Sequence, residues 1–406
     1  MKINILPFSK IILFLTSFSL AAQTNVEKKL LSQFLLAENN SLIQLEEGTI
    51  NLQKTLPLDG KKNIIIRGKG IDRTILNFAN QTSGAEGIKI TNCENIILEN
   101  LTVQNAKGDL IKTMEVKGIT FRKIKAEWTD GPKSTNGSYA LYPVMCENVL
   151  IDSCIAIGAS DAGIYVGQSK NIQVRNSKAF QNVAGIEIEN SLFAEVYNNQ
   201  AIGNTGGILV FDLPDLVQKK GGHVLVHDNL IQENNLPNFA PKGNIVGNVP
   251  QGTGVLILAT NNVEVFNNKI INHKTIGAGI ISYYMTEIPI KDKAYDPYPA
   301  GISIHDNYFE RKQTRVPAKG RFGKLYRFVL KVGKTPPMII YDGILDAKKI
   351  NSSGELFPEF KICIRNNTNQ SFMNIDAEHN FKNKSWDVSP YDCDFVNDKK
   401  VSQWKK

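Results

Sequence analysis

The stretch from Tyr139 to Asp212 decides the fold, because it repeats one short motif at a fixed spacing. The motif reads G-I-Y-V from Gly163, G-I-E-I from Gly185 and G-I-L-V from Gly207, so each copy starts 22 residues after the last. A fixed period of this length indicates one small unit that is stacked many times. Each copy is short and is bounded by turn residues, and its inward and outward residues alternate. This pattern predicts a β-strand.

A second set of alternating runs is interleaved with the first. These runs read N-V-L-I-D from Asn148, N-I-Q-V-R from Asn171, A-E-V-Y-N from Ala194 and H-V-L-V-H from His223. We therefore expect two short strands in each unit, and nothing in the unit has helical spacing. Stacked units of this kind form an all-β solenoid of parallel sheets around one continuous core. We expect about nine coils, each rising by about 4.8 Å.

The start of the chain has the pattern of a signal peptide. Lys2 and Lys10 precede the apolar run Ile11–Leu20, and small residues follow it. A basic stretch, a short apolar run and small residues in this order are typical of a secretory signal. The run is too short to span a bilayer. We predict an exported protein, periplasmic or secreted, without a transmembrane segment.

Composition and charge suggest a class of partner without fixing it. The chain has 406 residues, of which 42% are hydrophobic and 21% charged, and this composition is typical of a globular protein. Its formal net charge is +8. A basic exported protein suits an acidic polysaccharide, although a surplus of charge also serves solubility alone. We expect no nucleic-acid partner.

The five cysteines fall into two groups. An oxidising compartment permits disulfides, and an odd number leaves at least one cysteine unpaired. We expect Cys363 and Cys393 to pair and to staple the C-terminal region. Cys93, Cys146 and Cys154 are expected to be buried stacking residues.

The chain divides into five predicted segments. A solenoid needs a terminal cap over its apolar end, and residues 25–37 have the spacing of an amphipathic helix. The residues that give this spacing are Val26, Leu30, Leu31, Phe34 and Leu35. The predicted segments are a signal peptide (1–22), a capping helix (23–40), the solenoid coils (41–310), a basic flanking segment (311–335), and a final coil with a C-terminal cap (336–406).

Irregular segments interrupt or flank the period and are candidates for function. Residues 234–252 and 274–300 form two insertions, and long loops on a rigid scaffold often carry function. Residues 322–332 have the spacing of a short amphipathic helix, which we expect to pack on the flank of the solenoid.

A polar pair follows many of the second strands and is expected to align from coil to coil. Asn and Asp tolerate left-handed turn geometry, and stacked amides can form a ladder of hydrogen bonds. The pairs are Asn198-Asn199, Asp228-Asn229, Asn267-Asn268, Asp306-Asn307 and Asn366-Asn367.

Alternation predicts which side chains of the first strands face outward. In G-I-Y-V, Ile164 and Val166 point into the core, so Tyr165 points out. Asp161 lies just before this strand and can reach the same face. Above these coils the outward positions become apolar, which predicts a covered region and a polar groove of limited length. The predicted outward columns are Tyr142, Tyr165, Glu187 and Leu209; Val144, Gly167, Glu189 and Phe211; and Met145, Gln168, Asn190 and Asp212.

The acidic part of this face has three interpretations. Glu187, Glu189 and Asp212 can bind Ca²⁺, since hard cations take several oxygen ligands. The same carboxyl groups can serve as the acid and base of a glycoside hydrolase. The third interpretation is that outward strand positions are simply polar.

The stretch Tyr139–Asp212 resembles the right-handed parallel β-helix superfamily that includes pectate lyases and mannuronan C5-epimerases. The epimerases carry Y-G-F-D-P-H where this chain has Y-A-L-Y-P-V. Tyr139 matches the family's catalytic tyrosine and Pro143 its proline, whereas Tyr142 and Val144 replace its aspartate and histidine. The segments E-W-T-D-G-P-K-S-T-N-G-S-Y-A-L-Y-P-V and A-S-D-A-G-I-Y-V-G-Q-S also resemble bacterial parallel β-helix repeat-containing proteins. The resemblance implies a right-handed parallel β-helix.

Chemistry on a uronate needs a cation, a base and a proton donor. Lys133 lies just before the strand and is our candidate for the cation, with Tyr139, Tyr142 and Asp161 as candidates for proton transfer. A nearby cation would have to lower the pKa of a tyrosine for it to act as the base. The residues predicted to bind the substrate are Tyr165, Gln168, Asn190 and Glu187.

Together these observations predict an exported protein that acts on or binds an acidic polysaccharide in the manner of a lyase or epimerase. The alternative is a noncatalytic protein that binds glycan or supports a partner in the cell envelope.

Overall fold

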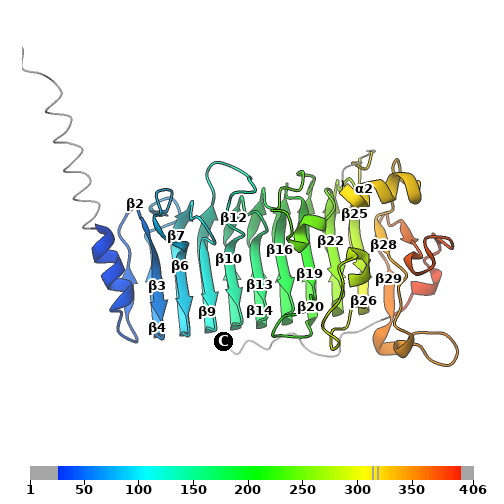
Figure 1. The fold of residues 1–406 in the computed structure, drawn as a ribbon, viewed down its shortest axis with the longest axis horizontal. Helices are drawn as coiled ribbons and strands as arrows, with labels where there is room; N and C mark the ends of the chain where they lie inside the picture. Colours follow the sequence, from blue (N-terminus) through cyan, green and yellow to red (C-terminus); the bar gives the residue numbers. More distant parts are fainter. Residues whose placement is uncertain (1–25, 313–314, 318–319, 395–406) are drawn as a thin grey trace, which may run out of the picture.

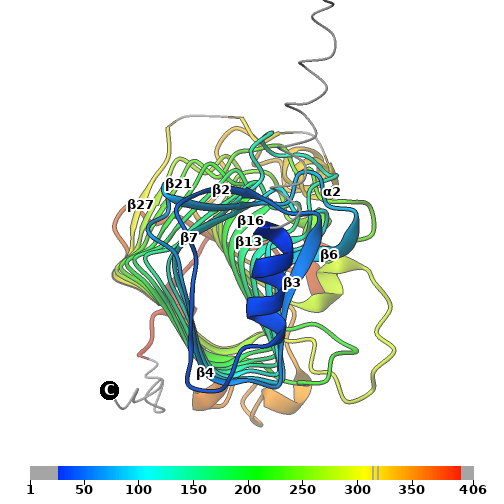
Figure 2. The same ribbon diagram turned by 90° about the vertical axis from the view of Figure 1, so that its left-hand side faces the viewer.

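The computed structural model describes residues 26–312, 315–317 and 320–394, so the predicted signal peptide lies outside the described residues. The described chain forms one long stack of parallel strands (Figure 1). Seen along the stack, the strands of successive coils lie behind one another (Figure 2). Among the described residues, no helix combines the length and the hydrophobicity that crossing a membrane requires.

One sheet contains the first strands of the coils in chain order. It has eleven strands, and each pairs in parallel with the next. The predicted first strands are therefore confirmed, and the described stack has more coils than the nine we expected. The strands are β3 (Lys54–Asp59), β6 (Ser83–Thr91), β8 (Ile111–Met114), β10 (Tyr139–Val144), β13 (Ala162–Gly167), β16 (Ala184–Glu189), β19 (Gly206–Phe211), β22 (Thr253–Leu258), β25 (Ile276–Ile281), β28 (Ile339–Tyr341) and β30 (Phe372–Asn374).

The other sheet has nineteen strands and forms two further faces of the coil. One face contains β1 (Leu42–Gln44), β4 (Lys62–Arg67), β7 (Glu94–Gln104), β9 (Lys117–Glu127), β11 (Glu147–Asp152), β14 (Lys170–Arg175), β17 (Leu192–Tyr197), β20 (Gly222–His227), β23 (Asn261–Phe266), β26 (Ala300–His305) and β29 (Ile362–Arg365). The other contains β2 (Gly48–Asn51), β5 (Thr74–Asn77), β12 (Ile155–Ile157), β15 (Lys178–Phe180), β18 (Gln200–Ile202), β21 (Leu230–Gln232), β24 (Lys269–Ile271) and β27 (Tyr308–Glu310), while β7 and β9 run on into it.

A regular coil thus has three strands, and our expectation of two was wrong. The third strands in the regular coils have only three residues, as in β15 and β18. A run of three residues is too short to show a period of two, and it follows the second strand after a single turn. The sequence therefore gave no separate signal for it.

The core is built by identical side chains in register. Ile164 of β13 lies opposite Ile186 of β16, which lies opposite Ile208 of β19. All three are fully buried. Removing such a side chain from water contributes about 1.5–3 kcal/mol, and the repeat adds this contribution at every coil. The stack is stable because each coil covers the apolar face of its neighbour.

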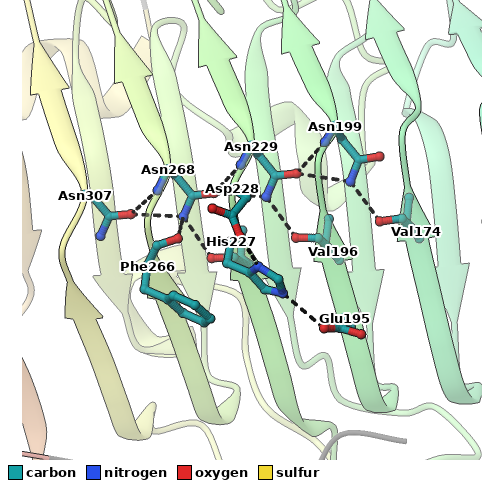
Figure 3. Close-up of polar contacts among 11 residues, drawn as sticks. Val174, Glu195, Val196, Asn199, His227, Asp228, Asn229, Phe266, Asn268 and Asn307 are labelled. Atoms are coloured by element: carbon teal, nitrogen blue, oxygen red, sulfur yellow. Dashed lines mark hydrogen bonds and ion pairs between the residues drawn. The ribbon is translucent and has the colours of Figure 1, made fainter. Parts of the chain in front are cut away.

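The polar pairs after the second strands form the predicted ladder (Figure 3). The first members adopt left-handed backbone geometry, as in Asn198 with φ of 54° and Asp228 with φ of 52°. The second members are buried, and each donates from its side chain to the carboxamide oxygen of the next. The side-chain distances are 3.1 Å for Asn199–Asn229, 3.0 Å for Asn229–Asn268, 3.0 Å for Asn268–Asn307 and 2.9 Å for Asn307–Asn367.

A column of stacked rings runs along the same face. Tyr197, His227, Phe266 and His305 stack in register, with centroid distances of 5.2, 4.7 and 5.3 Å. Each histidine lies between two carboxylates. Figure 3 shows His227 between Asp228, at 2.7 Å, and Glu195, at 3.1 Å. His305 repeats the arrangement with its own aspartate and glutamate.

The two ends of the stack are closed by different means. Residues 26–35 form a helix across the N-terminal end (Figure 2). Leu30 and Phe34 are buried there, whereas Val26 and Leu35 are exposed, so the apolar stripe is narrower than predicted. At the other end, Cys363 and Cys393 form the predicted disulfide. The remaining three cysteines are buried, also as predicted.

The basic flanking segment contains the short helix that its spacing predicted. Tyr326, Leu330 and Val332 are buried against the outer face of the coils, while Phe328 and Val329 are exposed. Besides the helix of residues 26–35, the helical elements of the described chain are α2 (Gly320–Lys324) and the π-turn η3 (Leu325–Val329), with 3-10 turns η1 (Ile245–Asn248), η2 (Tyr283–Thr286), η4 (Ala347–Lys349), η5 (Pro358–Phe360), η6 (Ala377–His379) and η7 (Ser389–Tyr391).

Replacement of Asn229 by Ala should destabilise the protein by about 1–3 kcal/mol. The backbone N–H of Asn199 would lose its acceptor on Asn229, and a buried group left without a partner costs about 1–3 kcal/mol, whereas the Asn199 side chain keeps its bond to the Val174 carbonyl. Urea unfolding of Asn229→Ala measures this loss. Lys269→Ala, at an exposed position, is the control and should change stability little. Equal stability of the two variants would contradict the ladder's role.

The histidine column should make stability depend on pH. Burial opposes the charge of His227, but its bonds to Glu195 and Asp228 outweigh burial and raise its pKa. The bond to Glu264 raises the pKa of His305. A raised histidine pKa contributes stability below the unfolded value of about 6.5, and this is lost as pH rises through the folded value. Urea unfolding of His227→Gln/His305→Gln between about pH 5 and 8 should lack this loss.

Candidate functional site

One column of outward side chains runs along the eleven-stranded sheet, with one side chain from each coil. Lys89 of β6 lies opposite Lys112 of β8, which lies opposite Tyr142 of β10. Further along, Tyr165 lies opposite Glu187, and Glu187 opposite Leu209. The predicted alignment is therefore confirmed, and the column changes from lysine through tyrosine and carboxyl to leucine.

Three tyrosines gather where this column passes from basic to acidic. The ring centroids of Tyr139 lie 4.4 Å from those of both Tyr142 and Tyr165. Tyr139 has room because its register neighbour is the small Ala162. The ring of Tyr165 lies over Gly167, where an added Cβ would come within 2.2 Å of the phenol oxygen. Its hydroxyl donates to Glu189 Oε1 at 2.6 Å.

The carboxyl groups of the next coils are buried. Asp161 accepts a hydrogen bond from Asn244 Nδ2 at 3.1 Å. Burial, followed by the charge of Glu189, raises the pKa of Asp161 to about 7. Burial also raises the pKa of Glu189 to about 7 and that of Asp212 to about 8. The pKa of Glu187 is raised well above its ordinary value for the same reason, with further contributions from Asp161 and Glu189.

Two insertions cover this part of the face, so the polar groove predicted at Tyr165 and Glu187 is absent. The exposed fraction is 4% for Tyr165 and 1% for Glu187. Val246 and Val249 come from the first insertion and Tyr295 from the second, and all three belong to one apolar cluster with Tyr165. We call residues 238–251 and 283–297 the cover. The cover reaches Tyr165 and Glu187, whereas the apolar outward residues predicted a covered region that starts only at Leu209 and Phe211.

The two predicted substrate-binding amides hold a loop instead. Gln168 Oε1 accepts from the backbone N–H of Val217 at 2.9 Å. Asn190 accepts from the backbone of Leu213 at 2.7 Å and donates to the carbonyls of Leu213 and Gln218. Their hydrogen bonds therefore fix residues 212–221 against the coils.

The lysine at the site is Lys112 and not Lys133. Lys133 is exposed on a loop and pairs with Asp130 at 3.1 Å. Lys112 Nζ lies 4.9 Å from the ring centroid of Tyr142. Alternation within I-K-T-M indicates that the Lys112 side chain points outward. The sequence does not show that Lys112 lies beside Tyr142, because that depends on the pairing register of β8 and β10. Sequence reasoning missed it because the predicted outward column began at Tyr142 and was not extended to the coil before it.

Asp109 is a second residue that sequence reasoning missed. Its Oδ1 accepts from the backbone N–H of Tyr139 at 3.1 Å. Burial raises the pKa of Asp109 to about 6, against the effects of that bond and of Lys112. Burial, and then the charge of Asp109, raises the pKa of Tyr142 to about 12. Lys112, Asp109 and Tyr142 are all partly exposed, in contrast to the covered carboxyl groups.

The environment of the tyrosines opposes their use as bases. Burial, and then the charges of Asp161 and Glu187, raise the pKa of Tyr139 well above 10. The structure thus lacks the lowered pKa that a base requires, and the tyrosines stay protonated near neutral pH.

The described part of the chain has no group of three or more His, Cys, Asp or Glu side chains arranged to hold a metal ion. Glu187, Glu189 and Asp212 lie in neighbouring coils, but Glu189 is bonded to Tyr165 and Asp212 Oδ2 accepts from Gly221 N at 3.2 Å. A calcium site at these residues would require them to rearrange.

Comparison with a family model identifies the repeat. The model described as a right-handed β-helix region matches residues 58–215 and 134–293. These matches cover more than half of the chain, and the protein belongs to this family of right-handed parallel β-helices. No curated protein matches the sequence.

Several solved structures are similar to this chain at low sequence identity. The A-module of the Azotobacter vinelandii mannuronan C-5 epimerase AlgE4 is 12% identical, with a TM-score of 0.48 over 85% of this chain and 90% of that one. Pectate lyase Pel9A is 12% identical, with a TM-score of 0.37 over 71% and 72% of the two chains. The tailspike of Escherichia coli bacteriophage HK620 is 13% identical, with a TM-score of 0.46 over 81% and 59%.

Gly167→Ala should destabilise the protein by about 1–3 kcal/mol. The new methyl group would displace the Tyr165 ring and break its bond to the buried Glu189, which would leave a buried polar group unpaired. Thermal and urea unfolding measure the effect. Gly247→Ala is the matched control, since an added Cβ there meets nothing closer than 3.9 Å. A neutral result at Gly167 would show that the ring moves freely.

Proposed function

We propose that this protein is exported and binds an acidic polysaccharide along the open part of the outer face, from Lys89 to Tyr142. The observation that carries the proposal is the position of Lys112, whose amine lies 4.9 Å from the Tyr142 ring with Lys89 in the adjacent coil. Strand spacing places successive coils about 4.8 Å apart. The two lysines therefore offer positive charge at a short, regular interval beside an aromatic ring.

The surroundings of the lysines favour an anionic ligand. Lys89 pairs with Glu86 only at 3.7 Å, and its side chain is 41% exposed. The covered carboxyl groups have raised pKa values and carry less charge than their number suggests. The formal net charge of the full chain is +8, and loss of Lys2 and Lys10 with the predicted signal peptide leaves +6 (8 − 2), which acts in the same direction at long range. A uronan, which carries a carboxylate on each sugar, matches such a face.

Lys112, Asp109 and Tyr142 together support an action on the bound chain. Lys112 would neutralise the uronate carboxylate, which makes the neighbouring C–H more acidic. The Asp109 carboxylate would take that proton, since its pKa of about 6 leaves it ionised at neutral pH and still basic. The Tyr142 hydroxyl would give a proton either to the same carbon from the other side, as in epimerisation, or to the departing glycosidic oxygen, as in a lyase.

A noncatalytic glycan-binding or cell-envelope scaffold protein is the second candidate. The observation that favours it is the burial of Asp161 and Glu189, which the cover keeps from any ligand. On this hypothesis the open face binds glycan without changing it.

Lys112→Ala should weaken binding to alginate or pectate about tenfold or more, because a hydrogen bond to a charged group contributes about 1.5–3 kcal/mol. Titration calorimetry at low and high salt measures the affinity, which should fall with salt. Lys117→Ala, an exposed lysine on the other sheet, is the control. Neutral glycans should bind weakly. No binding of either uronan by the wild type would reject the proposed function.

Turnover separates the two candidates. A lyase would release an unsaturated product that absorbs ultraviolet light, and an epimerase would exchange the C5 proton with deuterium from solvent. Asp109→Asn and Tyr142→Phe should abolish either signal while binding is retained. Binding by the wild type without either signal would leave the noncatalytic protein.

A further inference from the structure

The cover is attached to the coils at the buried carboxyl groups. Asn244 in segment 238–251 donates to Asp161. Tyr295 in segment 283–297 donates from its hydroxyl to the backbone carbonyl of Asp212. Val246 and Val249 of the cover also pack in the apolar cluster that contains Tyr165. Each segment of the cover therefore closes over a carboxyl group or its backbone.

The carboxyl groups beneath the cover are crowded and dry. Asp161, Glu187, Glu189 and Asp212 come from three successive coils, with exposed fractions of 7%, 1%, 9% and 2%. Glu187 Oε2 and Asp212 Oδ1 are buried without a hydrogen-bond partner. Several anions in so small a volume would repel one another and would lack solvation. The closed arrangement therefore requires bound protons.

We infer that this carboxyl cluster is a proton-dependent latch, which holds the cover closed when protonated and releases it when ionised. In the closed state the outer face ends at Tyr142. In the released state Tyr165 and Glu187 become accessible, and the face extends by two coils that are now negatively charged. The latch thus regulates the length and the charge of the binding face. The effect on the binding face deepens the proposed function and rests on it. The proton-dependent closure itself does not depend on the proposed function.

The direction of the pH dependence follows from the raised pKa values. Closed Asp161 and Glu189 have a pKa of about 7, against ordinary values of 3.8 and 4.5, and Asp212 has about 8 against 3.8. The closed state therefore binds more protons than the open state. Closure weakens as the pH rises from the pKa values of the carboxyl groups in the open state to their pKa values in the closed state. The change levels off above about pH 8. Each group contributes up to about tenfold per pH unit.

Other charged or titratable groups also face the cluster. Burial and the surrounding carboxylates hold the pKa of Tyr165 and Tyr295 well above 10, so these phenols stay neutral over this range. Lys220 lowers the pKa of Asp212, and Asp296 raises it. The full set comprises Tyr139 and Tyr142 of β10, Tyr165 of β13, Asp109 before β8, Lys220 after β19, and Tyr283, Tyr295 and Asp296 of the cover and its edge.

The cover has space into which it can move. Segment 238–251 lines one side of a cleft of about 550 Å³, and residues of segment 283–297 and of α2 line the rest of it. Asn244 lines this cleft and also bonds Asp161, so the cleft reaches the residue that contacts the latch. Movement of the segment into this cleft would separate Asn244 from Asp161 without displacing the strands of the coils, none of which lines the cleft.

Hydrogen–deuterium exchange of the full chain tests the latch. Protection factors, corrected for the intrinsic pH dependence of exchange, should fall about tenfold or more per pH unit in residues 238–251 and 283–297 between about pH 5 and 7, and level off near pH 8. Protection in β20 and β23 should not follow this course. In Asp161→Asn, the fall of the cover's protection factors with pH should be smaller by about tenfold per pH unit, because one of the titrating groups is removed. Glu147→Gln, at an exposed position, is the matched control and should keep the full slope.

Circular dichroism at pH 5 verifies that each variant folds, and Glu189→Gln provides the same test if Asp161→Asn does not. Protection of the cover that is independent of pH, or an unchanged slope in both variants, would overturn the latch. That result would leave uronan binding at pH 5 untouched. Conversely, a pH-dependent cover in a protein that binds no uronan at any pH would reject the proposed function and keep the latch.

Discussion

The structure depends on one constraint, which is that every coil must repeat the hydrogen bonds of the coil before it in the same register. A slip of one residue would turn Ile164 outward and Tyr165 into the core. The buried amides from Asn199 to Asn367 reinforce the register, because each uses both its backbone and its side chain to bond to the next. A single displaced coil would break several bonds of this ladder at once.

This constraint explains how much of the fold could be predicted from the sequence. The faces of Ile164 and Tyr165, the left-handed turns at Asn198 and Asp228, and the amide ladder all repeat with the coil. Repetition makes such features visible in one sequence. The three-residue strands repeat as well, but they are too short to show alternation. Predictions were reliable where a position recurs and each recurrence is long enough to identify.

The candidate site could be predicted only in part, because its decisive contacts do not repeat. Asn244 meets Asp161 across 83 residues of sequence. The composition of the insertion indicated a loop, but no spacing in the chain states where that loop lies. Exposure at Tyr165 and Glu187 was therefore predicted wrongly, although their alignment was right. For Lys112, alternation along its strand indicates that the side chain points outward. Its position beside Tyr142, however, follows only from the pairing register of the two strands.

The cap at the C-terminal end has a further consequence for association between molecules. Cys393 is bonded to Cys363 of β29, while Tyr391 packs against Phe372 of β30 and Tyr341 of β28. The last coil of a parallel stack presents unpaired backbone groups, which can add another chain end to end. The disulfide ties the blocking segment to that coil. Reduction would remove this covalent tie at β29 and would weaken the protection of the end of the stack against end-to-end pairing.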